Sequence, residues 1–424
     1  MKIVMMTNTY APFVGGVEKS IKGFSEEYRK HGHEVLIVAP VFENMPDHEE
    51  NVVRLPAIQN FNGTDFSVQL PIPGILGKKL NDFGPDIIHS HHPYLVGDTA
   101  LRAAAEYAIP IVFTFHTYYE RYTHYVPGDS PALQRFAASL AIGYANLCSH
   151  IIAPSSSVRK DLAGRGVVTP ISVIPTGINL NLFSNGNGNR FRAKEGIGAD
   201  KKVIGFVSRL APEKNIHFLG EAVAQYLEMD RDAHYIVAGS GPSRDELLEI
   251  FSRHKVGDRV HAPGTLKGQQ LVDCYHAMDM FAFASQTETQ GLVLAEAMAC
   301  GVPVVALDGP GIRDVVENDR NGLVVHKKEI AVFVESLQNF FRHDSEKIHS
   351  MRQEALDTAR RFTLPACARK AMQLYERLLA EKRYGKRIEG SVWDKSRRLI
   401  KAEWELMSNM AKSMQSAVKG SKSE

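Results

Sequence analysis

Short apolar segments alternate with helical patterns along the chain, and this alternation restricts the possible fold more than any other sequence feature. Apolar runs predict strands at 2–7, 34–39, 86–89 and 109–115, with helical stretches between them. Such alternation is typical of an α/β protein built on a doubly wound parallel sheet. Ligands bind such sheets beyond the carboxyl ends of the strands, so we expect functional residues in the loops that follow them.

Bulk properties exclude several classes of protein. A chain of 424 residues predicts two to three domains at about 150 residues each. The net charge of +2 gives no reason to expect a nucleic-acid partner, and the four cysteines lie far apart without metal-ligand spacing, as in a cytosolic protein with reduced thiols. No apolar run reaches the ~18 residues of a membrane span, so the chain is expected to be neither secreted nor membrane-spanning.

The segment 280–305 has the pattern of a strand, a polar loop, a helix, a turn and a second strand. Residues 292–300 contain no helix breaker, and Gly301 and Pro303 predict the end of the helix. The helix is apolar or small on every side, so it is expected to be buried, with Glu296 as its lone charge. Burial of a carboxylate is costly unless ligand hydroxyls, an arginine or backbone amides satisfy it.

Glu288 lies in the loop before this helix. The backbone amides of Gln290, Gly291 and Leu292 stand at the helix start, where phosphate is the commonest ligand. A phosphate there, flanked by two carboxylates that accept hydrogen bonds from hydroxyls, describes a nucleotide-sugar. We therefore expect a nucleotide-sugar site around this loop and helix.

The run Thr-Glu-Thr-Gln-Gly-Leu-Val-Leu-Ala-Glu-Ala-Met-Ala-Cys-Gly, residues 287–301, resembles the paired-glutamate motif of retaining glycosyltransferase family 4. The resemblance implies the GT-B fold, with two doubly wound Rossmann-like domains facing across a cleft and a C-terminal helix crossing back to the first. It also implies that Glu288 holds hydroxyls of the donor sugar and that Glu296 holds the ribose.

Two cations follow the predicted strand at 203–208. Arg209 and Lys214 precede the next helix, where they can neutralise a diphosphate without a metal, although a solvated surface pair is the alternative. The run Ser-Arg-Leu-Ala-Pro-Glu-Lys-Asn, residues 208–215, resembles the diphosphate motif of the family. Leu266 follows Gly264-Thr and matches the place where the family holds the base through main-chain contacts.

In the first half of the chain, Gly15 and Gly16 separate the first strand from a helical pattern at 17–29. This turn brings the backbone close to a phosphate, or it is a plain tight turn. His116 follows the strand at 109–115, where the alternative is a satisfied core histidine. The resemblance implies that the glycine loop faces the sugar and diphosphate, and that His116 contacts the donor sugar near the reacting carbon.

The run His-Thr-Tyr-Tyr-Glu-Arg-Tyr-Thr-His-Tyr, residues 116–125, resembles the subgroup of the family that glucosylates diacylglycerol in bacterial membranes. Tyr118, Tyr119 and Tyr122 would then shape the entrance for the acceptor, or else pack a loop. The three histidines at 89, 91 and 92 are not expected to bind a metal, because no carboxylate or cysteine completes a ligand set.

The expected organisation is an acceptor-side domain at 1–184, a polar linker at 185–202, a nucleotide-sugar-binding domain at 203–363, a crossover helix at 364–381 and a basic tail at 382–424. From Glu381 onward the chain carries eleven Lys and Arg against six Asp and Glu. Apolar residues recur in it at near-helical spacing. The tail either lies in an anionic membrane surface, packs on the catalytic body or is partly disordered. Trp393, Arg397, Arg398 and Trp404 are the predicted membrane residues.

Together, the patterns and the family resemblance imply a retaining transfer of a hexose, glucose from UDP-glucose, to a membrane lipid hydroxyl such as diacylglycerol. We expect no cofactor and no metal, and a cytoplasmic protein held peripherally on the inner face of the cell membrane. The alternatives are a family 4 transferase with a soluble or polyprenyl-linked acceptor, a nucleotide-sugar epimerase, and a catalytically silent nucleotide-sugar-binding protein. The predicted catalytic residues are His116, Arg209, Lys214 and Glu288, and the predicted donor-binding residues are Gly15, Gly16, Leu266, Gln290, Gly291, Leu292 and Glu296.

Overall fold

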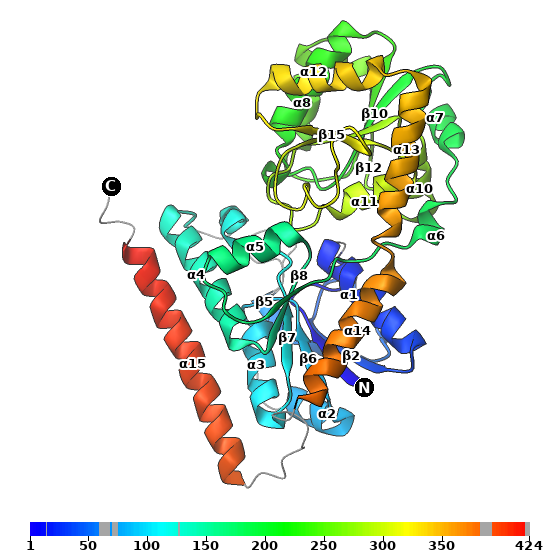
Figure 1. Ribbon diagram of the computed structural model, residues 1–424. Coiled ribbons are helices and arrows are strands. Elements are labelled where there is room, and N and C mark those ends of the chain that lie inside the picture. The colour runs from blue at the N-terminus through cyan, green and yellow to red at the C-terminus, as the bar shows by residue number, and fades with distance from the viewer. Residues whose placement is uncertain (14, 59–67, 70–74, 126–127, 382–391, 420–424) are drawn as a thin grey trace. The chain divides into compact units, whose positions relative to one another are not determined.

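A computed structural model describes residues 1–13, 15–58, 68–69, 75–125, 128–381 and 392–419 (Figure 1). The chain divides into two units. Unit 1 comprises Met1–Gly177 together with Leu364–Glu424, and unit 2 comprises Ile178–Thr363. The chain therefore leaves unit 1 at Gly177, seven residues before the boundary expected from the sequence, and returns to it at Leu364.

The described part of unit 1 is built around a parallel sheet in the order β3-β2-β1-β6-β7-β8-β9. Its strands are β1 Lys2–Met6, β2 Glu34–Pro40, β3 Val52–Leu55, β6 Ile87–Ser90, β7 Ile111–Thr114, β8 His150–Ala153 and β9 Ile171–Val173. The short strands β4 Ala57–Ile58 and β5 Val68–Gln69 pair separately. Its helices are α1 Gly16–Lys30, α2 Ile75–Phe83, α3 Val96–Tyr107, α4 Pro131–Leu147, α5 Ser156–Gly164, α14 Leu364–Ala380 and α15 Val392–Lys419.

Helices cover both faces of this sheet, because successive side chains of a strand point to opposite faces. Ile3 and Met5 of β1 belong to a core with residues of α1 and α14. Val4 and Met6 of the same strand belong to a second core with residues of α3 and α4. Figure 1 shows α1 and α14 on one side of these strands and α3 on the other. A strand buried on both faces explains why the segment at 2–7 is apolar throughout.

Unit 2 has a second parallel sheet, in the order β12-β11-β10-β13-β14-β15. Its strands are β10 Lys202–Val207, β11 Ala233–Ala238, β12 Val260–Gly264, β13 Met280–Phe283, β14 Val304–Leu307 and β15 Gly322–Val325. Its helices are α6 Leu180–Phe183, α7 Gly188–Glu195, α8 Ile216–Met229, α9 Arg244–Arg253, α10 Gly268–His276, α11 Leu292–Ala299, α12 Ile330–Arg342 and α13 Ser345–Arg360. The prediction of doubly wound parallel sheets is confirmed in both units.

The segment at 185–202 is not a linker, which corrects the expectation from its polar composition. It contains α7, whose first turn is capped by Asn187 Oδ1 accepting a hydrogen bond from the Arg190 amide. The Arg190 guanidinium also pairs with Asp273 of α10, and Phe191 is buried in the core of unit 2. Capping asparagines and a single buried phenylalanine produce a packed helix where composition alone suggested a flexible chain.

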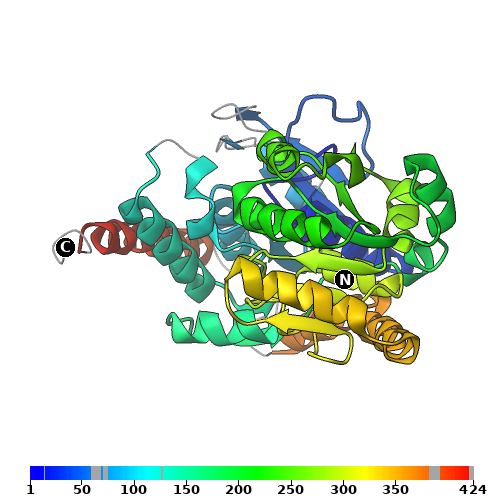
Figure 2. The same ribbon diagram turned by 90° about the horizontal axis from the view of Figure 1, so that it is seen from above.

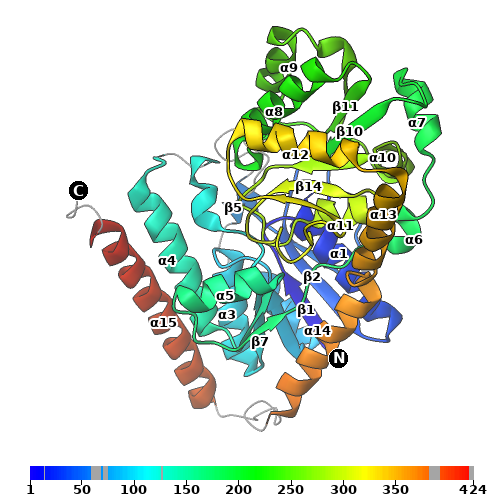
Figure 3. The ribbon, with the colours of Figure 1, turned by 45° about the horizontal axis from the view of Figure 1, so that its top comes forward.

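The long helix α15 packs along α4 and α3 within unit 1. Figure 2 shows its ribbon, in red, running against the ribbon of α4, and Figure 3 shows the same pair from another angle. Among the helices that the structure describes, none combines the length and the hydropathy needed to cross a bilayer.

Candidate active site

The strand order reverses beside the first strand of each sheet, and most of the predicted site residues lie after strands at or near these reversals: β1 and β7 in unit 1, and β10, β12 and β13 in unit 2. In unit 2 the chain builds outward from β10 through β11 and β12, and then resumes on the other side of β10 with β13. In unit 1 the same reversal separates β1 from β6. Doubly wound sheets bind ligands beyond the carboxyl ends of the strands at such a switch point.

The loops that follow β10 and β13 are joined to each other at the unit 2 switch point. The hydroxyls of Ser285 and Thr287 both donate to the Glu213 carbonyl, at 3.3 and 3.2 Å. In return, the Asn215 side-chain amide donates to the Ala284 carbonyl at 3.2 Å. Short polar side chains thus hold the two loops in register. The sequence analysis did not single out these residues, because none of them carries a charge, although Asn215 and Thr287 lie within the two family-like runs.

These hydrogen bonds between the two loops bring Lys214 and Glu288 together. Lys214 Nζ donates to Glu288 Oε1 at 2.6 Å, and each side chain is only 15% exposed. The two residues are 74 positions apart in the chain, so only the joined loops make the contact. A largely buried lysine and glutamate beyond the carboxyl ends of adjacent strands form a polar pair that can contact both an anion and hydroxyl groups.

A third loop, after β14, lies against the loop that carries Glu288. Gly311 has a φ of +74°, and a Cβ at this position would stand 2.8 Å from the Gln290 nitrogen and 2.9 Å from the Glu288 carbonyl oxygen. Only glycine accommodates both the left-handed backbone and this approach. The loop after β14 therefore supports the backbone of the Glu288 loop.

Helix α11 begins at this loop, and it is buried as predicted. Gly291 is its N-cap, with a left-handed φ of 70°, and residues 294–299 are buried. Gln290 is 5% exposed, and Leu292 is half-buried. The first amides of a helix have no acceptor within it, and the helix dipole makes this end attractive to anions. The three predicted amides thus lie beside the Lys214–Glu288 pair.

Glu296 has a tyrosine partner that the sequence analysis did not identify. The carboxylate is 3% exposed, and the Tyr275 hydroxyl of α10 donates to its Oε2 at 2.9 Å. Burial and then the neighbouring Glu296 raise the pKa of Tyr275 well above its ordinary value, so the phenol stays protonated and remains a donor. No local sequence signal links the two residues, which lie on different helices.

The remaining predicted residues of unit 2 lie beyond the carboxyl ends of its strands. Arg209 is exposed in the loop after β10, and Leu266 is half-buried in the loop after β12. The Gly239 amide donates to the Gly264 carbonyl, and the Leu210 amide donates to the Ser240 carbonyl. The loops after β10, β11 and β12 are therefore linked by backbone hydrogen bonds and form one continuous edge.

Buried histidines hold the switch point of unit 1 together. The Asn8 amide, after β1, donates to His92 Nδ1 at 3.1 Å, and the Asn8 side chain donates to the Tyr94 carbonyl after β6. Gly15 is the N-cap of α1 with an extended backbone, and a Cβ at Gly16 would meet nothing within 4 Å. A Cβ at Gly15, in contrast, would stand 2.8 Å from the Phe13 ring, so the open space lies at Gly16.

His116 follows β7 and contacts a second histidine. His91 Nδ1 lies 2.9 Å from His116 Nε2, and the two rings are nearly parallel. Burial, together with neighbouring histidines, lowers the pKa of both side chains well below the ordinary value. Both rings are therefore neutral near pH 7, and one donates to the other. The sequence analysis considered His91 only as a metal ligand and did not link it to His116, because no local pattern joins two residues that are 25 positions apart.

The histidine at 89 belongs to the core rather than to a metal site. The Tyr375 hydroxyl of α14 is 2.7 Å from His89 Nδ1, and His89 Nε2 is 2.7 Å from the Thr114 hydroxyl. In the part of the chain that the structure describes, no group of three or more His, Cys, Asp or Glu side chains is arranged to hold a metal ion. All four cysteines are free thiols.

The structure corrects part of the predicted acceptor entrance. Tyr118 is 4% exposed, with its ring against Phe115 and under the Arg165 guanidinium, so it packs the loop rather than facing an acceptor. Tyr119 packs against the same core and meets the Tyr94 ring edge-on. Tyr119 and Tyr122 are both half-buried, and Tyr122 lies in the following turn with its ring stacked near those of His124 and Tyr125.

The predicted membrane residues do not all lie on the same face of α15. Trp404 and Arg397 are exposed on α15, whereas Arg398 Nε donates to the Ala105 carbonyl of α3 at 2.9 Å. Arg398 therefore belongs to the face of α15 that packs on unit 1, and its assignment to the membrane is wrong. The side chain of Trp393 lies outside the described residues.

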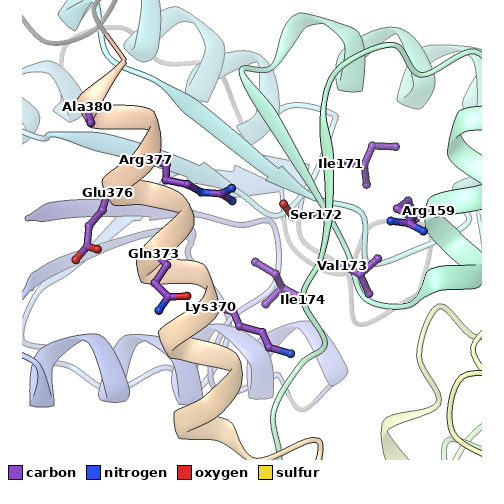
Figure 4. Close-up of a pocket in the computed structure, with 10 residues that line it drawn as sticks. All are labelled: Arg159, Ile171, Ser172, Val173, Ile174, Lys370, Gln373, Glu376, Arg377 and Ala380. Carbon is purple, nitrogen blue, oxygen red and sulfur yellow. The ribbon is translucent and has the colours of Figure 1, made fainter.

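A cavity of about 860 Å³ opens elsewhere in unit 1, between the edge strand β9 and α14. Figure 4 shows the residues that line it, with Lys370 and Arg377 reaching from α14 towards the strand. None of the predicted site residues lies in this cavity. Each unit therefore has its own group of candidate site residues, in the loops around its switch point.

Comparison with known proteins places the chain in a family. Residues 14–182 match the family model described as Glycosyltransferase Family 4, and residues 188–358 match the model described as Glycosyl transferases group 1. The α-monoglucosyldiacylglycerol synthase of Streptococcus pneumoniae is 31% identical over 77% of this chain and 75% of that protein. The enzyme of the same name from Acholeplasma laidlawii is 30% identical over 78% of this chain and 86% of that protein.

More distant relatives and solved structures agree with this placement. A GDP-mannose-dependent α-mannosyltransferase from Corynebacterium glutamicum is 27% identical over 80% of this chain and 79% of that protein. Sucrose-phosphate synthase from Thermosynechococcus elongatus has the same fold, with a TM-score of 0.74 at 21% identity over 89% of this chain and 99% of that chain. Anabaena HepE in complex with UDP-glucose matches with a TM-score of 0.71 at 22% identity, over 89% and 100% of the respective chains. The protein therefore has the GT-B fold and belongs to glycosyltransferase family 4.

Proposed function

We propose that the protein transfers a glucosyl residue from UDP-glucose to a hydroxyl of diacylglycerol, with retention of the anomeric configuration. The observation that carries this proposal is the Lys214–Glu288 contact beside the start of α11, at the switch point of unit 2. The names of the two relatives from Streptococcus pneumoniae and Acholeplasma laidlawii support glucose and diacylglycerol, and the ligand of Anabaena HepE supports UDP-glucose.

Lys214, Arg209 and the first amides of α11 are proposed to bind the diphosphate of the donor. Cleavage of the glycosidic bond places negative charge on this group. Fixed cations and helix-start amides stabilise that charge without having to reorganise during the reaction. Because Lys214 and Glu288 already satisfy each other, the lysine is held in place before the donor arrives. This electrostatic role is proposed to make a metal unnecessary.

The two glutamates are proposed to bind hydroxyl groups of the donor. Glu288 would accept from the sugar, and Glu296 from the ribose of the nucleotide. The hydrogen bond from Tyr275 fixes the orientation of the Glu296 carboxylate, so its remaining lone pairs point in a defined direction. Main-chain groups near Leu266 would hold the base.

His116 is proposed to contact the donor sugar near the reacting carbon. Positive charge develops on the sugar ring as the diphosphate departs, and a cationic imidazole would oppose it. The lowered pKa keeps His116 neutral, so it can form a hydrogen bond with the sugar without this repulsion. In the proposed retaining mechanism, the acceptor hydroxyl attacks on the face that the diphosphate leaves, and the departing phosphate takes the proton of that hydroxyl.

The acceptor is proposed to reach the protein from an anionic membrane surface, on the inner face of the cell membrane. Tyr122 is the proposed acceptor-side residue, because its ring is not packed into the core of unit 1. A second candidate function follows from the relative in Corynebacterium glutamicum, which uses GDP-mannose. The competing proposal for the donor is therefore GDP-mannose, from which the protein would transfer mannose to a lipid.

The test is a matrix of donors and acceptors. Purified protein is incubated with UDP-glucose or GDP-mannose and with diacylglycerol in anionic mixed micelles, a soluble sugar, or no acceptor. Nucleotide release and product mass are followed, and the anomer is assigned by NMR. An α-glucosyl lipid formed only from UDP-glucose and diacylglycerol supports the proposal. A mannosyl lipid, a soluble glycoside, or an epimerised nucleotide-sugar would each replace it with a different function.

A further inference from the structure

Helix α15 has two faces with opposite surroundings, and the first is docked on unit 1. Its docked positions recur every three or four residues, as one side of a helix does. Ala402 is 9% exposed, Ser413 is fully buried, and Leu406 packs against the core. The Asn409 side chain donates to the Leu140 carbonyl of α4 at 3.1 Å. Packing on the catalytic body, one of the alternatives considered for the tail, is confirmed for this face.

Charged groups fix the same face to α3. Lys395 pairs with Glu106 at 2.6 Å, and Glu403 pairs with Arg102 at 2.5 Å. The carboxyl of Glu403 has a lowered pKa, chiefly because of the hydrogen bond from Arg102. These contacts set the rotation of α15 about its own axis. They therefore determine which side chains the helix presents to solvent.

The opposite face carries an exposed apolar ridge. Six large apolar side chains lie on it, and their spacings of three or four residues place them along one side of the helix. The ridge consists of Ile400 (67% exposed), Trp404 (71%), Met407 (65%), Met410 (38%), Met414 (56%) and Val418 (61%). Elsewhere in the described chain only five large apolar side chains are exposed, and they are spread over both units. Contiguous exposed apolar surface of this kind marks an interaction site.

The charges beside the ridge are mostly positive. Arg397 and Lys412 are exposed and make no ion pair with any residue that the structure describes, and Lys401 is 76% exposed. Two acidic residues lie among them: Glu405, 3.7 Å from Lys401, and the exposed Asp394 in the first turn of the helix. The docked face, in contrast, has its charges paired. Cations beside a row of apolar side chains match a surface with anionic head groups above an apolar layer.

We propose that α15 is the membrane-docking element of the protein, with its ridge inserted among the lipids of an anionic bilayer and the cations at its side against the head groups. The choice of a membrane as the occupant rests on the lipid acceptor proposed above. A second copy of the chain fits less well, because a symmetric contact through this face would bring the same cations together. The docked face keeps α15 rigidly attached to unit 1 when the ridge inserts.

The first experiment uses the full-length protein and vesicles of phosphatidylglycerol and phosphatidylcholine in equal amounts. The protein has two tryptophans, so Trp393→Phe leaves Trp404 as the sole reporter. Vesicles should shift Trp404 emission to the blue, and brominated lipid should quench it. Pure phosphatidylcholine vesicles should give a much smaller change. An unchanged spectrum with anionic vesicles would overturn the proposal.

The second experiment compares two variants by vesicle sedimentation. The triple change Met407→Ser, Met414→Ser and Trp404→Ser should lower vesicle binding at least about tenfold, since apolar burial dominates such binding. The control Val168→Ser with Met229→Ser removes equally exposed apolar residues elsewhere and should bind like the parent. Equal binding by the triple variant contradicts the proposal. A parent dimer that the triple change dissociates, without vesicle binding, would assign the ridge to a second copy.

Activity separates this inference from the proposed function. With a short-chain diacylglycerol that is dispersed as monomers, the triple variant should keep the parent rate, because none of the ridge residues belongs to the loops at either switch point. If neither protein glucosylates this substrate but the parent still binds vesicles, the proposed function fails and the docking surface stands. If the triple variant loses the short-chain activity as well, the ridge serves the fold or the site, and the docking proposal fails.

Discussion

The two switch points share one topology but differ in chemistry. In unit 2 the loops meet through a lysine–glutamate pair, a tyrosine–glutamate hydrogen bond and hydroxyl groups. In unit 1 they meet through histidines that burial keeps neutral, among them His91, His92 and His116. If both switch points bind the donor as proposed, strand order determines where it binds, whereas the loops determine which of its groups each switch point holds. Loops with charged side chains suit a diphosphate, and loops with neutral side chains suit a sugar that becomes positively charged during the reaction.

The largest effect is expected from removing Lys214, one of the charged residues at the switch point of unit 2. Lys214→Ala should lower the turnover number by roughly 10² to 10³, the cost of removing one preorganised group that stabilises an anionic leaving group. Lys202→Ala is the matched control, because Lys202 also pairs with a carboxylate, Asp230, but at the amino end of β10. Initial rates of UDP release and circular dichroism are the measurements. Equal losses in the two variants would remove the special role of the switch point.

The second prediction concerns how the stability of unit 1 depends on pH, because the histidines near its switch point are neutral. Burial lowers the pKa of both His89 and His92 to about 3, from 6.5. Between these values the unfolded chain binds more protons than the folded chain, so acid favours unfolding. Stability is full above pH 6.5 and falls as pH decreases through this window, by about 1.4 kcal/mol per pH unit for each histidine.

Unit 2 provides the comparison for this pH effect. Its Asp308 has a carboxyl pKa below the ordinary 3.8 because of the Arg313 guanidinium, so this group loses its contribution only at more acidic pH. The partly buried pair His234 and His261 also has lowered pKa values. Hydrogen exchange, corrected for intrinsic rates, should show β6 and β7 losing protection at pH 5 before β10 and β13. The reverse order would contradict the assignment of neutral histidines to unit 1.

A smaller effect is expected from His116 itself. His116→Ala should lower kcat/KM about tenfold, the value of one neutral hydrogen bond made to the sugar. His150→Asn is the control, because His150 bonds the Ser172 hydroxyl at the opposite end of the same sheet. Rates are measured with saturating acceptor. A loss in the control as large as that in His116→Ala would show that both histidines serve only the fold.

The glycine loop of unit 2 should show a smaller effect on activity and a moderate one on stability. Gly311→Ala places a methyl group against the backbone of Gln290 and Glu288, so KM for the donor should rise several-fold. Its left-handed φ adds about 1–2 kcal/mol of destabilisation. Gly268→Ala has a similar φ with nothing within 4 Å, so it should show the backbone cost alone. Similar donor KM values in the two variants would mean that the loop does not support Glu288.

The smallest effect is expected from metal removal. If Lys214, Arg209 and the helix-start amides neutralise the diphosphate, dialysis against EDTA should leave the rate within about twofold, since fixed protein charges replace a divalent ion. The measurement is UDP release before and after dialysis, with Mg²⁺ added back as the control. A large loss of rate that added Mg²⁺ reverses would show that the charged residues at the unit 2 switch point do not neutralise the diphosphate without a metal.

Much of this protein followed from the sequence, because its signals are local. Strand-length apolar runs, glycine stops and the run from Thr287 to Gly301 specify backbone geometry within a few residues of themselves, so the α/β fold, the buried α11 and the family were readable. The helical pattern of the tail was equally local. These features depend on periodicity and on short-range sterics, which a linear chain displays directly.

Only the tertiary structure determined which side chains contact one another. Lys214 meets Glu288, Tyr275 meets Glu296, and His91 meets His116 only because strand order brings separate loops and helices together. Whether 185–202 is a linker depended on Phe191 finding a core. Which side of α15 faces solvent was set by α3 and α4, since a helix with apolar residues on two sides has no preferred rotation until a neighbour covers one of them.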